Sequence, residues 1–261
     1  MVQSLVEIAG FIEALRRDGE VLVDSSVRAG WDTLVPTCPE WRVRDLVAHT
    51  GSVHRWAVGY LDGKTEGRPI EICAPDDVDA LADWFREGHL RLLNRLTTAP
   101  ADLECWTFLP APTPLAFWAR RQAHETAIHR VDAESALGGR PREFTAEFAA
   151  EFAADGIDEL LAGFHVRSRS KVRTEQPRSL LVQTTDTASD TGQPSEWLLH
   201  LSQEPLRVEQ LTDTGSVSAD CTISGSSPTV YRALWNRGRY EDLDVTGDPS
   251  LVELWRRTSA V

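Results

Sequence analysis

The stretch Trp118-Ala-Arg-Arg-Gln-Ala-His-Glu-Thr-Ala-Ile-His-Arg-Val-Asp-Ala133 predicts the helix around which this chain folds. Glu125 and His129 are four residues apart, so on a helix their side chains lie on one face, one turn apart. A carboxylate and an imidazole in this arrangement can bind one metal ion together. Trp118 and Gln122 continue the same stripe, which predicts that this face points into a bundle of helices.

Further helices are predicted on both sides of this stretch. The central helix covers residues 114–137 and ends at Gly138-Gly139. Apolar residues recur at helical spacing over three earlier segments, which are 4–30, 42–61 and 76–97. Thr145 can cap a fifth helix that runs to Phe164. The first part of the chain is therefore predicted to be entirely helical.

The sequence pattern changes after Phe164. Residues 165–178 are rich in arginine and poor in apolar side chains, which indicates a linker or an exposed first strand. Alternating hydrophobicity then predicts short strands over 179–185, 197–203, 205–211 and 219–224. Ser227-Pro228 and Asp248-Pro249 each have the residue types that open a helix, with Ser227 as a cap. We predict two domains: a helical bundle over residues 1–165 and a small α+β domain with an antiparallel or mixed sheet over residues 166–261.

Composition excludes several classes of partner. The 261 residues carry a net charge of −13, which argues against nucleic acid and anionic membranes. No apolar run is long enough to span a membrane. Glu7 and Glu13 lie where the apolar segment of a signal peptide would be, so no signal peptide is predicted. The cysteines form no C-x-x-C pair, which favours reduced thiols and a cytoplasmic location. The near absence of lysine is typical of a GC-rich bacterial genome, such as that of an actinobacterium.

His49 is the predicted third ligand beside Glu125 and His129. It lies on the apolar stripe of the predicted helix over 42–61, and this stripe faces the bundle interior. Two imidazoles and one carboxylate suit Zn²⁺, and three protein ligands leave positions open for a reacting group. A Glu-x-x-x-His pair also occurs on solvated helix faces, and a histidine on an apolar stripe is often a hydrogen-bonded core residue.

The other histidines are weaker candidates. His54 lies about 140° round the helix from His49, so the two cannot easily share an ion. His54 and His89 remain the alternative ligands, whereas His124 is predicted to be exposed. No role is assigned to His165 and His200. The sequence contains no G-x-S-x-G elbow, P-loop or G-x-G-x-x-G motif.

Three segments resemble a known family. Residues 35–49, followed by His54-Arg-Trp56, resemble the N-terminal signature of the mycothiol-dependent maleylpyruvate isomerase family. Residues 121–130 are similar to its second metal motif, and residues 218–256 resemble its C-terminal domain. The resemblance implies a DinB-like four-helix bundle with a divalent metal at one end, followed by a sterol-carrier-like domain.

The resemblance also implies functional residues. It makes His49, Glu125 and His129 the ligands of Zn²⁺ or another divalent metal, with mycothiol as cosubstrate. It places an arginine of the C-terminal domain at the active site, for which Arg237 matches best and Arg239 is the alternative. Where the family tends to place a small hydroxyl residue, this chain has Arg42, so the second helix loses a possible N-cap worth about 1 kcal/mol.

The expected function is that of a zinc-dependent enzyme in which a low-molecular-weight thiol attacks a small electrophilic substrate. The reaction is either an isomerisation or an S-transfer, and the sequence does not distinguish them or name the substrate. Two alternatives are a metal-dependent hydrolase that activates water and a non-enzymatic ligand-binding protein. The expected partners are small molecules, with neither nucleic acid nor membrane, and the sequence says nothing firm about oligomers.

Overall fold

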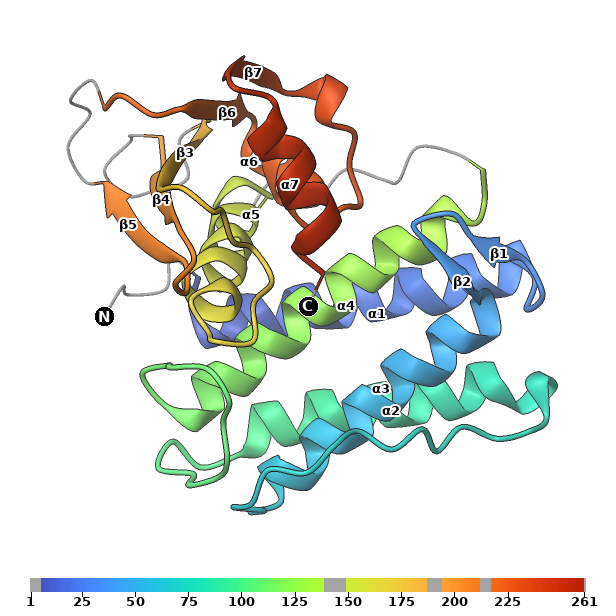
Figure 1. Ribbon diagram of the computed structural model, residues 1–261. Coiled ribbons are helices and arrows are strands. Elements are labelled where there is room, and N and C mark those ends of the chain that lie inside the picture. Colours follow the sequence, from blue (N-terminus) through green and yellow to red (C-terminus); the bar gives the residue numbers. More distant parts are fainter. Residues whose placement is uncertain (1–5, 139–148, 187–193, 212–216, 261) are drawn as a thin grey trace. The chain divides into compact units, whose positions relative to one another are not determined.

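The computed structural model describes residues 6–138, 149–186, 194–211 and 217–260, and it contains two compact units (Figure 1). The first unit comprises Glu7–Arg142, and the second is formed mainly by Glu143–Val261. A helical part thus precedes a smaller part with a sheet, which confirms the predicted fold class. Among the described residues, no helix combines the length and the apolar composition needed to cross a bilayer.

The first unit is built from four long helices. They are α1 (Ile8–Ala29), α2 (Val43–Leu61), α3 (Leu81–Thr98) and α4 (Pro114–Ser135), with a short 3₁₀ turn η1 (Val78–Ala80) before α3. α1 packs against α3 and α4, and α2 packs against the same two helices. Each predicted helix of this unit is present, and the bounds differ by a few residues because helix ends depend on local capping.

The start of α4 follows the expected capping pattern. Thr113 is the N-cap, its Oγ1 accepts a hydrogen bond from the backbone N–H of Ala116 at 3.1 Å, and Pro114 occupies the first turn. Most side chains of α4 are buried, on all sides of the helix. The prediction that His124 is exposed is therefore wrong: its ring is buried and lies edge-on to Phe11 of α1 at 5.8 Å. α1 packs against α4 and covers this ring.

A short hairpin precedes α2. β1 (Leu34–Val35) pairs antiparallel with β2 (Cys38–Arg42). Arg42, the N-cap of α2, has no capping hydroxyl, but its backbone N–H donates to the carboxylate of Asp45 at 2.8 Å. The acidic side chain in the first turn thus satisfies one of the exposed backbone donors at this helix end.

The second unit contains a mixed five-stranded sheet in the order β5-β4-β3-β6-β7. Its strands are β3 (Arg178–Thr184), β4 (Glu196–Leu201), β5 (Arg207–Leu211), β6 (Cys221–Gly225) and β7 (Asp244–Gly247). β3 and β6 are parallel, and the other neighbouring strands are antiparallel. The predicted strands are all present, and β7 is an additional edge strand.

Helices and turns complete the second unit. They are α5 (Ala149–Asp158), the π-helical turn η2 (Glu159–His165), α6 (Ser227–Leu234), the 3₁₀ turn η3 (Tyr240–Asp242) and α7 (Ser250–Thr258). The predicted cap Thr145 lies outside the described residues. Ser226 rather than Ser227 is the N-cap of α6, and the backbone N–H and hydroxyl of Ser227 donate to the carboxylate of Asp186.

The compact units do not follow the expected boundary between residues 165 and 166. α5 and η2 belong to the second unit, because α5 packs against α6. Ring contacts join these elements, with Phe152 at 6.3 Å from Tyr231 and Phe164 at 6.0 Å from Trp235. The segment over 166–177, expected as a linker or a first strand, is irregular and lies within the same unit.

Candidate metal centre

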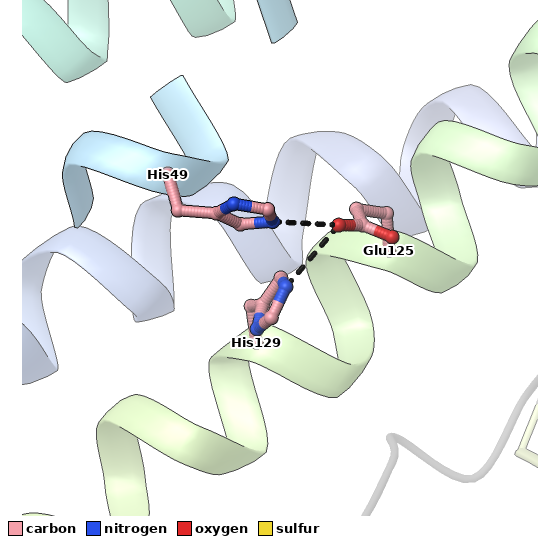
Figure 2. Close-up of side chains that lie close together, drawn as sticks. All are labelled: His49, Glu125 and His129. Atoms are coloured by element: carbon pink, nitrogen blue, oxygen red, sulfur yellow. Dashed lines mark hydrogen bonds and ion pairs between the residues drawn. The ribbon is translucent and has the colours of Figure 1, made fainter. Parts of the chain in front are cut away.

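The first unit brings His49, Glu125 and His129 together (Figure 2). His49 projects from α2, and the other two project from α4, one helical turn apart. Their potential ligand atoms all lie within 4.8 Å of one another. The Nε2 atom of each histidine lies 3.2 Å from Oε1 of Glu125, so both rings point toward the same carboxylate oxygen. The three predicted ligands are therefore neighbours in the fold.

Arg121 determines how the Glu125 carboxylate is oriented. Its Nη2 donates to Oε2 of Glu125 at 2.8 Å from one turn earlier on α4, and its side chain is buried. This contact leaves Oε1 for the two histidines. Burial raises the pKa of Glu125, but hydrogen bonds with His129 and His49 and the charge of Arg121 hold it well below its usual range. The carboxylate is therefore ionised at neutral pH, as a metal ligand must be.

Asp132 is the second carboxylate beside the site. Its Oδ2 lies 2.9 Å from Nδ1 of His129, on the ring edge opposite Glu125. Burial lowers the pKa of His129, but hydrogen bonds with Asp132 and Glu125 and their charges raise it to about 9. A ring placed between two carboxylates holds a proton that a divalent cation can replace.

Trp41 of β2 covers one side of the cluster. Its ring centroid lies 4.9 Å from that of His49 and 5.8 Å from that of His129. The side chains of His49 and Glu125 remain 25% and 21% exposed, so solvent reaches the site. Two imidazoles, one ionised carboxylate and partial access fit a divalent metal with an open coordination position.

The alternative ligands lie elsewhere in the first unit. The Nε2 atom of His54 lies 2.9 Å from Oγ1 of Thr126, and its ring is 5.3 Å from that of His89. Burial lowers the pKa of both histidines, so these rings are neutral core residues. In the second unit, His165 is buried in η2 and His200 lies on β4. None of these four belongs to the cluster of three ligands.

The two candidate arginines belong to the second unit. Asn236 lies just after the end of α6 and has a φ of 58°, a conformation typical of helix ends. Arg237 is the next residue. The Nη1 of Arg237 donates to the carbonyl of Trp235 at 2.9 Å. Arg239 is exposed, and its Nε lies 3.6 Å from a carboxylate oxygen of Glu241. The role of either arginine at the metal centre stays a prediction.

The first unit also has a cavity of about 270 Å³ that none of the candidate ligands lines. It is bordered by α2, α3 and the loop after α2, through Arg55, Val58, Gly59, Asp62, Lys64 and Arg91. Its arginine and aspartate side chains already have partners: Arg91 and Arg95 pair with Asp62, and Arg55 donates to the carbonyl of Trp84. The three-ligand cluster remains the stronger candidate for chemistry.

Sequence reasoning missed three residues at this centre: Arg121, Asp132 and Trp41. The first two were open to inference, because they lie four residues before Glu125 and three residues after His129 on the same helix. Trp41 lies far from these residues in the sequence, and no local spacing indicated that the hairpin would bring it against the two histidines.

Comparisons with known proteins agree with this architecture. The model of the mycothiol maleylpyruvate isomerase N-terminal domain matches residues 12–134, and that of the MDMPI C-terminal domain matches residues 151–254. Together the two models span most of the chain and both of its units. No curated protein matches the sequence.

Solved structures give the same picture of the fold. Crystal structures of the mycothiol-dependent maleylpyruvate isomerase and of its histidine-to-alanine variant cover 94% of this chain and 96% of their own, with TM-scores of 0.58 and 0.59 and identities of 12% and 11%. Sterol carrier protein 2 from Yarrowia lipolytica covers 43% of this chain and 99% of its own at 13% identity, with a TM-score of 0.28. That score is too low to support the sterol-carrier-like shape, which stays a prediction.

Proposed function

Because the chain belongs to the mycothiol-dependent maleylpyruvate isomerase family, we propose that it is a thiol-dependent isomerase with a metal centre in its helical unit. His49, Glu125 and His129 bind a divalent cation, with Zn²⁺ as the first candidate. The observation that carries this proposal is the convergence of three ligand atoms from two helices to within 4.8 Å of one another.

The bound metal supplies one piece of chemistry, which is to favour the thiolate form of a thiol at neutral pH. The protein side chains hold the site in shape. Arg121 fixes the Glu125 carboxylate, and the ring of Trp41 shields one side of the two imidazoles from water. Mycothiol is the proposed cosubstrate, because the family is named for it.

The thiol acts as a nucleophile and is recovered. The thiolate sulfur adds to one carbon of an electrophilic carbon–carbon double bond and forms a carbon–sulfur bond. The π-electron pair of the double bond moves onto a conjugated carbonyl oxygen. The former double bond, now single, rotates, after which the electron pair returns and the thiolate leaves. Arg237 is the proposed partner of an anionic group on the substrate or on the thiol. If the sulfur stays on the substrate instead, the protein is an S-transferase.

Metal analysis tests the centre. Protein purified without chelators should hold about one zinc per chain, and His49→Ala, Glu125→Ala and His129→Ala should each retain almost none. His200→Ala, which removes a histidine of the second unit, should keep the wild-type content. If a ligand variant keeps its metal, that residue is not a ligand. If the wild type takes up no metal even from added Zn²⁺, the metal centre is disproved.

Thiol stoichiometry tests the reaction class. With maleylpyruvate and mycothiol, an isomerase should complete many turnovers on a small amount of thiol, because each cycle returns it. An S-transferase should instead consume one thiol for each product formed. Turnover that needs no thiol would contradict both assignments and favour a hydrolase that activates water.

A further inference from the structure

Asp132 is the most deeply buried carboxylate next to the proposed metal centre. Its side chain is 0% exposed, whereas that of Glu125 is 21% exposed. Oδ2 of Asp132 accepts a hydrogen bond from Nδ1 of His129 at 2.9 Å. Removing a charge from water is costly, so a carboxylate is rarely buried so completely unless neighbouring groups pair with it.

The contact between Asp132 and His129 determines which ring nitrogen can bind a metal. A neutral imidazole carries its proton on one nitrogen and offers a lone pair on the other. An acceptor at Nδ1 keeps the proton on that side, so Nε2 is the atom left to coordinate. Nε2 is also the atom that lies 3.2 Å from Oε1 of Glu125, on the side of the candidate ligands.

Two residues of the β1–β2 hairpin hold Asp132 in turn. Oγ1 of Thr37 donates to Oδ1 at 2.6 Å, and Sγ of Cys38 donates to Oδ2 at 3.6 Å. Thr37 is 95 positions away from Asp132 in the sequence, so this bond ties the hairpin to α4. The same hairpin carries Trp41, whose ring lies against His49 and His129.

We propose that Asp132 is the positioning residue of the metal centre and that Thr37 anchors it. Asp132 fixes the proton position and the ring orientation of His129. Thr37 holds the Asp132 carboxylate in place, so this carboxylate connects the hairpin to His129. This inference rests on the proposed metal centre. Carboxylates that orient metal-bound histidines typically change metal affinity by about 10–100-fold.

Zinc affinity, measured by competition with a chromophoric chelator, tests the proposal without any activity assay. Asp132→Asn keeps the side-chain volume and removes the charge, so its zinc dissociation constant should rise by about 10-fold or more. Thr37→Val should raise it by a smaller factor, and Thr37→Ser, which keeps the hydroxyl, should restore the wild-type value.

A matched control separates positioning from general loosening of the hairpin. Thr33→Val removes a hydroxyl beside the same hairpin that donates to the carbonyl of Ala29, and it should leave zinc affinity unchanged. Wild-type affinity in both Asp132→Asn and Thr37→Val would overturn the proposal. If Asp132→Asn does not fold, Thr37→Val against Thr37→Ser still decides it. If the wild type itself binds no zinc, the proposed metal centre fails, and this inference fails with it.

Discussion

At the scale of the single residue, Glu125 shows how neighbouring side chains orient a proposed metal ligand. One carboxylate oxygen faces both histidines, and the other accepts from Arg121. Fixing a side chain before the ligand arrives reduces the conformational entropy that binding must overcome. The buried partner Arg121 therefore makes the centre more rigid than three unsupported side chains would be.

Gln122 is a buried amide on the same helix without such support. It is 1% exposed, and neither Oε1 nor Nε2 has a hydrogen-bond partner within the described residues. Leaving buried polar groups unpaired costs about 1–3 kcal/mol. Gln122→Met, which keeps the length and removes the amide, should therefore raise the free energy of unfolding of the metal-free protein by about 1 kcal/mol. Urea unfolding measures this change.

A paired glutamine provides the comparison. Nε2 of Gln183 donates to Glu196 at 2.7 Å across two strands, so Gln183→Met should not stabilise the protein. Lower stability in Gln122→Met would contradict the expectation and would mean that the amide has a partner such as a buried water.

The sequence predicts these residues unequally. Glu125 and His129 follow from helix geometry alone, because a spacing of four residues fixes their relation. His49 follows from its place on an apolar stripe. The anchor formed by Thr37 and Asp132 depends on a hairpin that returns to α4 from far along the chain, and no local period encodes such a contact. His124 was misjudged because its exposure depends on what packs against α4.

At the scale of the element, η2 illustrates how packing determines the behaviour of a titratable group. His165 ends this π-helical turn, its Nδ1 lies 2.9 Å from Oγ of Ser170, and its ring centroid is 4.7 Å from that of Trp255 in α7. Burial is the main cause that lowers its pKa to about 4, with a further contribution from the charge of Arg173. The imidazole is thus neutral in the folded second unit.

This burial predicts a loss of stability in mild acid. The unfolded chain takes up a proton at His165 below about pH 6.5, whereas the folded chain does so only near pH 4. The contribution of His165 to the free energy of unfolding should be fully present above pH 6.5. It should fall by about 3 kcal/mol as the pH drops through this window, and then level off. Urea unfolding of the wild type and of His165→Gln, between pH 7.5 and 4, measures the difference.

His165→Gln should lose less stability across this window than the wild type, because glutamine has no group that titrates there. His200→Gln, at a part-exposed site on β4, controls for the removal of one histidine. Equal slopes for the wild type and His165→Gln would contradict the assignment of the acid sensitivity to η2.

At the scale of the whole molecule, each unit has its own buried core. Phe85, Leu46 and Leu22 belong to the first, and Trp197, Leu180 and Tyr231 belong to the second. The sequence predicts both parts but places their boundary after the fifth helix instead of before it. Helical periodicity identifies a helix and its apolar face, but it does not identify the partner of that face, and α5 packs against α6.

Arg237 tests whether the second unit contributes to the reaction proposed for the first. Arg237→Ala should keep its zinc and lower kcat/KM by about 10–100-fold, because a lost charged hydrogen bond costs about 1.5–3 kcal/mol. Arg237→Lys should recover only part of this loss, since lysine keeps the charge but not the planar pair of donors. Arg239→Ala is the matched comparison, as an exposed arginine two residues away that pairs with Glu241. Full activity in Arg237→Ala, with a loss in Arg239→Ala, would move the role to Arg239; full activity in both would confine the chemistry to the helical unit.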